Sequence, residues 1–364
     1  MNIQNERKIQ TLILIICLAL FAVLLIVANN SRGTDVVPRF VYHERGRVIS
    51  ILEEIHTPFP QQILEVEVLS GEFQGFSVEA RNNLLDRRLR SFYEGDRIII
   101  ALSDHDILVS SPDRLFPHVT LIALFIFLLA LIGGKRGVLS IIGLAFSMIC
   151  IIFILVPMTL AGHSSITMAL VIGILITIVS ITLLAGFNAK SLSAILGCIS
   201  GVVVATVFAS IAGHFALLNG YHLENAGMLS VFGPEISLSG IFISGVIIAA
   251  IGAITDTAMT IASSMEEVKK AHPSISSKDL FRAGLNVGRD AMGTMSNTLI
   301  LAFVGSSFSL ILLIASMNVS MIELINDFGI GIEIIQGIAG SIGIILTVPI
   351  TTLIAAKLLA KMQR

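Results

Sequence analysis

Eight apolar runs, each about as long as a membrane-spanning helix, constrain this chain more than any other feature. A helix needs about 20 apolar residues to cross the ~30 Å hydrocarbon core of a bilayer. The runs are Ile9–Ala28, Phe116–Gly133, Val138–Leu155, Ile166–Phe187, Leu192–Gly213, Ser237–Ile254, Met295–Ser316 and Gln336–Leu359. The sequence therefore predicts an all-α polytopic membrane protein with about eight transmembrane helices.

The composition agrees with a chain whose main partner is the lipid bilayer. It is 55% hydrophobic and only 13% charged, whereas soluble domains carry about 25% charged residues. The net charge of -2 provides no basic field for nucleic acid. Cys17, Cys150 and Cys198 all lie inside apolar runs and form no zinc or disulfide pattern. We therefore expect no nucleic-acid partner, no metal and no cofactor.

The first apolar run resembles a signal peptide in one respect, because Arg7 and Lys8 precede it. Its apolar core is, however, longer than the 7–15 residues typical of a signal peptide. Residues 1–28 are therefore predicted to be an uncleaved membrane anchor.

The positions of Lys and Arg predict the orientation of the chain, since cytoplasmic segments are enriched in these residues. Three short connections, at about 156–165, 214–236 and 317–335, contain neither. Both termini and the other connections hold the basic residues of the membrane part: Arg7, Lys8, Lys135, Arg136, Lys190, Lys269, Lys270, Lys278, Arg282, Arg289, Lys357, Lys361 and Arg364. Both termini are therefore predicted to be cytoplasmic.

The three outer connections carry acidic and histidine side chains instead: His163, His214, His222, Glu224, Glu235, Glu323, Asp327 and Glu333. They predict a negative vestibule that attracts cations. No histidine pair has metal-ligand spacing, so a metal site is not favoured. Within the last connection, Asn326–Gln336 is apolar but too short to span, and Gly329 and Gly331 favour an interfacial or re-entrant segment.

Residues 29–115 predict a separate extracytoplasmic β domain. Short β-rich runs cover Glu44–Glu54, Gln61–Ser70, Phe76–Arg81 and Asp96–Leu102, with turns at Gly71, Gly75 and Gly95. About five such strands suggest a small barrel or sandwich, similar to an OB fold. Residues 116–364 would then form a seven-helix membrane domain.

Two polar stripes flank the cytoplasmic connection at about 256–290. Asp256, Thr260, Ser263 and Glu267 share one face of a helix, and Asp290, Thr294 and Asn297 share a face of the next one. An ionisable residue within a span costs about 2.5–3.5 kcal/mol, so it usually faces a polar cavity or a partner. Our hypothesis is that Asp256 and Asp290 bind a cation or exchange protons.

Thr260, Thr294 and Asn297 would then supply neutral oxygen ligands, as hard cations require. The structural alternative stays open, because Asp256 and Asp290 would lie near the cytoplasmic ends of their helices, about a turn inside the headgroups. Asp290 would sit early on its helix, where the dipole favours a carboxylate, and it has Arg289 as a neighbour. The sequence predicts a solvated helix end at Glu266, Glu267, Lys269 and Lys270.

The same stretch carries a family resemblance. Three segments resemble the YibE/F-like family of bacterial multi-pass membrane proteins: Gly252-Ala-Ile-Thr-Asp256-Thr-Ala258, Ile261-Ala262-Ser263 and Gly288-Arg289-Asp290-x-x-Gly293-Thr294-Met295-x-Asn297-Thr298-Leu299. The resemblance implies the plasma membrane of a bacterium and a multi-pass architecture. It carries over no catalytic residue.

Three functions follow from these patterns. The first is an ion- or proton-coupled carrier or exporter of an unknown small solute. The second is a non-transporting scaffold or envelope factor, whose residues 29–115 bind a partner, envelope material or a second copy. The third is an intramembrane enzyme, although no P-loop, GxSxG, HExxH or CxxC motif occurs. We expect a protein that is not an enzyme.

Overall fold

A computed structural model describes residues 3–30, 41–56, 59–84, 90–103, 106–218, 220, 229, 236–317 and 319–361. The chain forms two compact units. One contains Thr34–Ile132, and we call it the barrel unit. The other contains Met1–Gly33 and Gly133–Arg364, and we call it the helical unit.

The barrel unit contains five strands: β1 (Val41–Ile55), β2 (Gln61–Val68), β3 (Ser77–Asn83), β4 (Arg97–Ser103) and β5 (Ile107–Pro112). They close into a barrel in the order β1-β2-β3-β5-β4. All neighbouring strands are antiparallel except β3 and β5, which are parallel. This order is that of an OB fold, and it confirms the prediction of a small β-barrel.

Alternating side chains fill the barrel. In β2 every second residue is buried, so that Leu64, Val66 and Val68 point inward beside Ile98 and Ile100 of β4. Such alternation is what a strand with one buried face requires. The expected turn glycines Gly71, Gly75 and Gly95 have φ of 78°, 86° and 88°, a region that favours glycine.

An ion pair joins β1 to Asp113, the residue that follows the last strand. The Arg45 guanidinium lies 2.7 Å from the Asp113 carboxylate, whose side chain is 4% exposed. Burial opposes ionisation of Asp113, but a hydrogen bond from the Leu115 amide and the Arg45 guanidinium outweigh it, and they hold the pKa below its ordinary value. A carboxyl with a lowered pKa stabilises the fold above its unfolded pKa, near 4, and this stabilisation is lost as pH falls further.

We expect a soluble fragment of residues 36–116 to fold alone, because its core lies within the barrel. It should give a β-type circular dichroism spectrum and a cooperative melt, with a lower melting temperature at pH 3 than at pH 7. The Asp113→Asn fragment should lose part of this pH dependence. A random-coil spectrum would contradict independent folding, and an unchanged pH dependence in Asp113→Asn would contradict the role of the ion pair.

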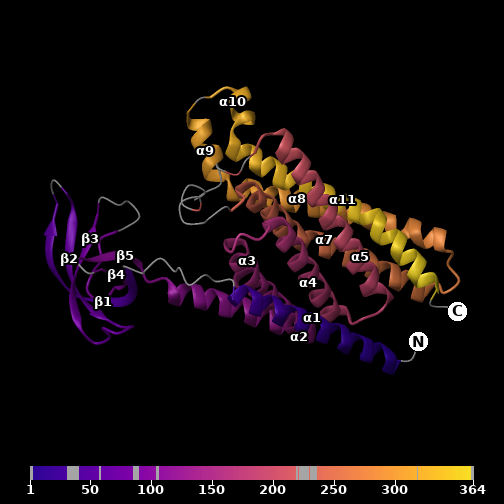
Figure 1. Cartoon of the computed structure of the whole chain (residues 1–364), viewed down its shortest axis with the longest axis horizontal. Coiled ribbons are helices and arrows are strands. Elements are labelled where there is room, and N and C mark those ends of the chain that lie inside the picture. Colours follow the sequence, from indigo (N-terminus) through magenta and orange to yellow (C-terminus); the bar gives the residue numbers. More distant parts are fainter. Residues whose placement is uncertain are drawn as a thin grey trace. The chain divides into compact units, whose positions relative to one another are not determined.

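The helical unit and the helix leading into it comprise α1 (Ile3–Asn30), α2 (Leu115–Cys150), the π-helical turn η1 (Ile151–Leu155), α3 (Val156–Leu160), α4 (Ser165–Ala185), α5 (Ala189–Phe215), α7 (Leu238–Ala271), α8 (Ser277–Ser306), α9 (Phe308–Ser316), α10 (Met321–Asn326) and α11 (Phe328–Lys361). In Figure 1, α1 begins and α11 ends at the same end of this unit, where α7 also meets α8. We call it the basic end, since Lys190, Lys269, Lys270, Lys278 and Arg282 belong to it.

Five described helices are long and apolar enough to cross a membrane, or six if the bent pair α8 and α9 is one span. The exact number of eight therefore stays a prediction. The expected connection between the second and third spans corresponds to non-helical backbone at Gly134, inside the continuous stretch Leu115–Leu160. Within the predicted first span, the apolar helical part covers Ile15–Asn29.

Two predicted segments have helix boundaries that the sequence did not indicate. The predicted span Met295–Ser316 contains a break, because α8 and α9 meet at Ser307 with a bend of 58°, and the pair can still form one span. The segment Asn326–Gln336 is not re-entrant, because α11 begins at Phe328 and runs without interruption through Gly329 and Gly331. The backbone of these glycines stays helical, since neither has a positive φ.

Small residues hold α5 and α11 together. A Cβ added at Gly197 would overlap the Thr351 side chain, and one at Gly201 would overlap the Thr347 hydroxyl and lie 3.0 Å from the Gly343 carbonyl oxygen. The i, i+4 spacing on both helices produces a close antiparallel contact. Such contacts are how helices associate where lipid removes the hydrophobic driving force.

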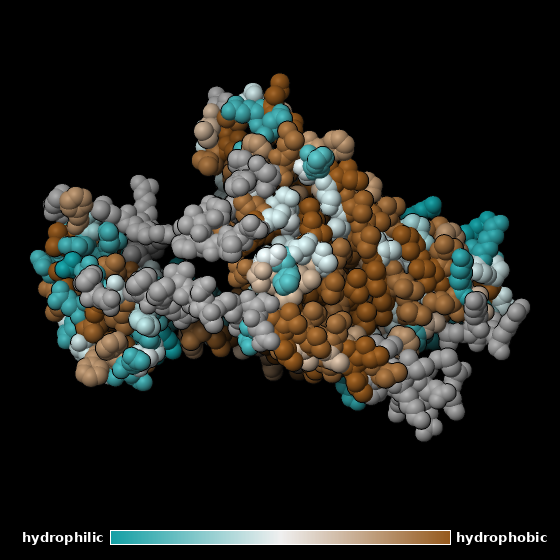
Figure 2. All heavy atoms as spheres, in the orientation of Figure 1, coloured by the Kyte–Doolittle hydropathy of each residue, from teal (hydrophilic) through white to brown (hydrophobic). Residues whose placement is uncertain are grey.

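The surface of the helical unit is mostly apolar. Figure 2 shows hydrophobic residues along the sides of the helices and hydrophilic ones on the barrel and at the basic end. The exposed side chains include Leu196, Val203, Ile248, Leu301 and Ile345. Large exposed apolar patches mark contact with a membrane or a partner, so the helical unit has the character of a membrane protein.

Candidate functional site

The predicted stripe on α7 lies on an uncovered face of that helix. Asp256 and Thr260 are exposed, and a Cβ added at Gly252 would meet no atom within 4 Å. The opposite face is buried, with Ile254, Ala258 and Ile261 in the core. The helix therefore presents its acidic residue away from the bundle.

The predicted stripe on α8 is exposed in the same way. Asp290, Thr294 and Asn297 are exposed, while Gly288 packs against Val348 and Ile261. The Thr294 hydroxyl donates to the backbone oxygen of Ala291, 3.0 Å away. Asp290 is the fourteenth residue of α8, so the expectation that it lies early on its helix was wrong, and no first-turn dipole stabilises it.

The two stripes lie at the same level. Gly288 is opposite Ile261 and Gly284 is opposite Met265, so α7 and α8 are antiparallel. Asp256 lies five residues before Ile261 on α7, and Gly293 lies five residues after Gly288 on α8. Because the helices are antiparallel, Asp256 is level with Gly293, in the turn that joins Asp290 to Thr294.

Neither carboxylate has a protein partner among the described residues. No described side chain or amide donates a hydrogen bond to Asp256 or Asp290, and no ion pair includes them. Arg289, the structural alternative, is exposed and forms no ion pair with Asp290. By contrast, Glu266 of α7 binds Lys190 of α5 at 2.8 Å and Lys270 at 3.5 Å, and because the Glu266 and Lys190 side chains are each only 20% exposed, the expectation of a solvated face was wrong for Glu266.

A second polar feature lies near the other end of α8, where this helix breaks. Ser307 separates α8 from α9 and is buried, and its side chain makes no capping hydrogen bond to α9. Broken helices are tolerated at membrane depth only where protein or a water-filled cavity surrounds the freed backbone. In several transporter folds, such breaks form the substrate site.

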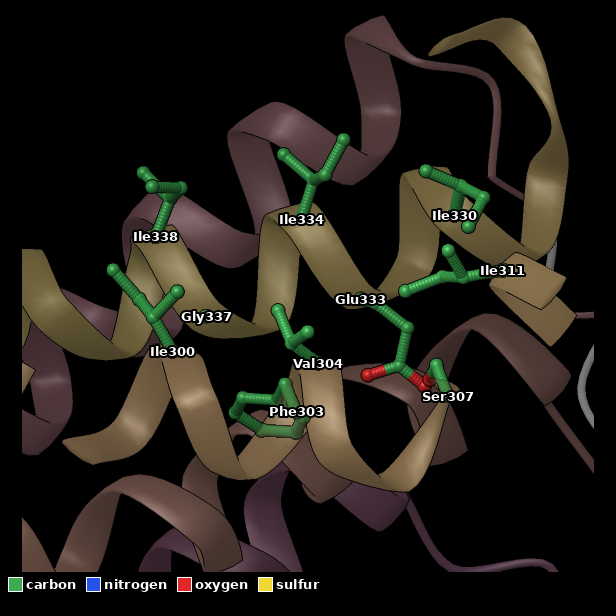
Figure 3. A pocket seen from close by; sticks show the side chains of 10 residues that line it. All are labelled: Ile300, Phe303, Val304, Ser307, Ile311, Ile330, Glu333, Ile334, Gly337 and Ile338. Atoms are coloured by element: carbon green, nitrogen blue, oxygen red, sulfur yellow. The ribbon is translucent and has the colours of Figure 1, made fainter. Parts of the chain in front are cut away.

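A cavity of about 170 Å³ lies at this break, between α8, α9 and α11. Figure 3 shows isoleucine side chains around it and the Glu333 carboxylate directed toward Ser307. Its lining is Ile300, Phe303, Val304, Ser307, Ile311, Ile330, Glu333, Ile334, Gly337 and Ile338. The cavity is thus apolar except for one carboxylate and one hydroxyl.

Glu333 is the residue that sequence reasoning assigned to the wrong place. It was expected in an outer loop, but it belongs to α11, and its Oε2 atom is buried without a hydrogen-bond partner. One sequence signal could have placed Glu333 in a helix, since it is a single acid among the apolar residues Ile332, Ile334 and Ile335. The interpretation of residues 317–335 as an outer connection left this signal unused.

The described residues contain no group of three or more His, Cys, Asp or Glu side chains that could hold a metal ion. His222, Glu224 and Glu235 of the expected vestibule lie outside the described residues. The stripes and the cavity therefore offer isolated carboxylates with neutral oxygens nearby, and each could bind a monovalent cation or a proton.

The family model described as YibE/F-like protein matches residues 121–361. The chain belongs to the YibE/F-like family. The matched part of this YibE/F-like protein includes both polar stripes and the Glu333 cavity. No curated protein and no solved structure matches the chain significantly.

Proposed function

We propose that this YibE/F-like protein is an ion- or proton-coupled membrane transporter of a small solute. Asp256 and Asp290 would bind the coupling ion, and Thr260, Thr294 and Asn297 would supply oxygen ligands. The observation that carries the proposal is that both carboxylates are unpaired, Asp256 on the span-length helix α7 and Asp290 on α8, which together with α9 is long and apolar enough to span.

Energetics supports this choice over a scaffold role. A carboxylate that faced lipid would cost several kcal/mol, and neither Asp256 nor Asp290 recovers this cost through an ion pair within the described chain. A water-filled path removes the cost, because water solvates the charge. The broken span α8–α9 is a second feature that transporters use.

The proposed orientation places both termini and the basic end in the cytoplasm of a bacterium, and residues 29–115 outside. Two observations support it. The connections at 156–165, 214–236 and 317–335 lack Lys and Arg. The start of α1 and the end of α11 lie at the same end of the helical unit (Figure 1).

The alternative function, a scaffold that binds envelope material or a partner, is favoured by one feature of the barrel. Phe73 and Phe76 in the β2–β3 connection are 51% and 65% exposed, and Tyr42 is 60% exposed. Exposed aromatic side chains are typical of binding surfaces. A scaffold would need no hydrated path at Asp256, and this difference separates the two functions.

Cysteine labelling tests the hydrated path, because thiols react as thiolates and therefore need water. The native Cys17, Cys150 and Cys198 are buried, so labelling of the wild-type protein measures the background signal. We expect Thr260→Cys and Asn297→Cys to react with a membrane-impermeant thiol reagent applied from the cytoplasmic side. A transporter further predicts that solute or the coupling ion changes their rates.

The matched control is Leu301→Cys, which lies one turn beyond Asn297 and is 58% exposed. It should not react, since an apolar exposed face contacts lipid. Ser276→Cys should react only from the cytoplasmic side, and Ser50→Cys only from outside. Unreactive Thr260→Cys and Asn297→Cys would contradict the transport path, and labelling of Ser276→Cys from outside would overturn the orientation.

A further inference from the structure

The cavity at the α8–α9 break combines three properties that together select a ligand. It is open on the side of Val304, Ile334 and Ile338, which are 43%, 47% and 49% exposed, and its volume of about 170 Å³ is sufficient for a body the size of benzene, which an enclosed cavity of ~150 Å³ holds in another protein. Its walls are isoleucine, valine and phenylalanine side chains. Its one ionisable group is Glu333, directed toward Ser307 (Figure 3).

The carboxylate has no positive partner within the described chain. Glu333 Oε2 is buried and accepts no hydrogen bond, and no described Lys, Arg or His pairs with it. A buried polar atom without a partner is unfavourable, and a buried charge more so. A ligand that donates hydrogen bonds and carries positive charge would satisfy this oxygen while leaving Glu333 ionised.

A bare divalent metal ion does not fit this lining. Ca²⁺ takes six to eight oxygen ligands, whereas the side chains lining this cavity offer only the oxygens of Glu333 and Ser307. An ammonium group needs fewer contacts, because it donates up to three hydrogen bonds. The Phe303 ring in the wall can also attract a cation through its face.

We propose that this cavity binds a small organic cation, in which an ammonium group is attached to an apolar body about the size of a benzene ring. The ammonium pairs with Glu333, and the apolar body fills the space between Ile300, Ile311 and Ile338. That such cations are transported substrates rests on the transport function proposed above. That they bind in this cavity can be tested without transport.

The test compares benzylamine with benzyl alcohol, which has nearly the same shape and no charge. Binding of both to the purified full-length protein in detergent is measured by calorimetry at pH 7.5, where the amine is protonated. We expect benzylamine to bind at least tenfold more tightly than benzyl alcohol. Glu333→Gln should reduce this ratio to about one, because the amide keeps the shape and removes the charge.

The matched control is Glu323→Gln on α10, an exposed acid that does not line the cavity, and it should keep the tenfold preference. Should Glu333→Gln fail to fold, Ile311→Phe provides a second variant, because the added ring fills the cavity and should weaken both probes alike. Equal binding of the two probes would overturn the proposal and indicate a lipid-chain pocket. Absence of saturable benzylamine binding, or an unchanged preference in Glu333→Gln, would also overturn it.

Transport is measured separately, as benzylamine uptake into proteoliposomes. Saturable binding without uptake would support the cavity and contradict the transport function. Uptake of other solutes, dependent on Asp256 but without benzylamine binding, would support transport and overturn the ligand class. The two proposals can therefore fail independently.

Discussion

Replacing Asp256 by Asn is expected to lower ion-coupled flux at least tenfold while leaving the melting temperature of the protein nearly unchanged. The amide keeps the shape of the side chain and removes the charge that would hold a cation or proton. No described ion pair or hydrogen bond is lost, and substitutions at exposed positions without such contacts usually change stability by less than about 0.5 kcal/mol. Flux into proteoliposomes and thermal melting should be measured on the same preparation.

The control for this prediction is Glu267→Gln, which also removes one acid from α7. Glu267 is exposed and contacts Lys270 at 3.1 Å, and surface pairs of this kind contribute about 0–1 kcal/mol. We expect normal flux and a nearly normal melting temperature. Full activity in the Asp256→Asn, Asp290→Asn double variant would contradict the ion-site hypothesis, whatever its stability. A large fall in stability instead would indicate that the carboxylates bind a structural partner.

The sequence was most informative where one physical rule acts locally. The β-rich run Gln61–Ser70 predicted a strand, and β2 covers Gln61–Val68 with every second residue buried. The apolar run Ile166–Phe187 predicted a helix, and α4 covers most of it. Both patterns depend only on the period of the backbone, 2 for a strand and 3.6 for a helix.

The break at Ser307 was not predictable from hydropathy. Met295–Ser316 has the composition of one span, and a window average cannot detect a bend of 58°. The residues that line the space beside the bend include Glu333 and others of α11, which lie apart from it in the sequence. Such tertiary information is absent from a local pattern, and for the same reason the cavity was missed.

The candidate stripes were predictable only in part. Spacing placed Asp256 with Thr260 and Asp290 with Thr294, and the structure shows each pair on one exposed face. Spacing could not show that α8 begins as early as Ser277. Ser276 caps α8 through the Asp279 amide, a local signal that precedes the apolar run by almost twenty residues.

The α5–α11 contact leads to a large expected effect on stability. Gly201→Ala should lower the melting temperature, and Gly201→Val should prevent accumulation of folded protein. The new Cβ would collide with the Thr347 hydroxyl and approach the Gly343 carbonyl oxygen and Ile254 to 3.0 Å. Overpacking typically costs 1–3 kcal/mol, and here the backbone of α11 would have to move, because relocating the hydroxyl alone leaves the carbonyl contact. Melting followed by size-exclusion chromatography of the detergent-solubilised protein measures this.

Gly252→Ala is the matched control, since it makes the same change within a helix where an added Cβ meets no atom within 4 Å. It should leave the melting temperature unchanged or raise it, because Ala is favoured over Gly in helices by about 1 kcal/mol. Thr347→Ala should partly restore Gly201→Ala, because it removes the colliding hydroxyl, so the effects of the two substitutions should be non-additive. A Gly201→Ala protein as stable as the wild type would contradict the close approach of α5 and α11. Additive losses in the double variant would instead place the strain at the Gly343 backbone, with Thr347 uninvolved.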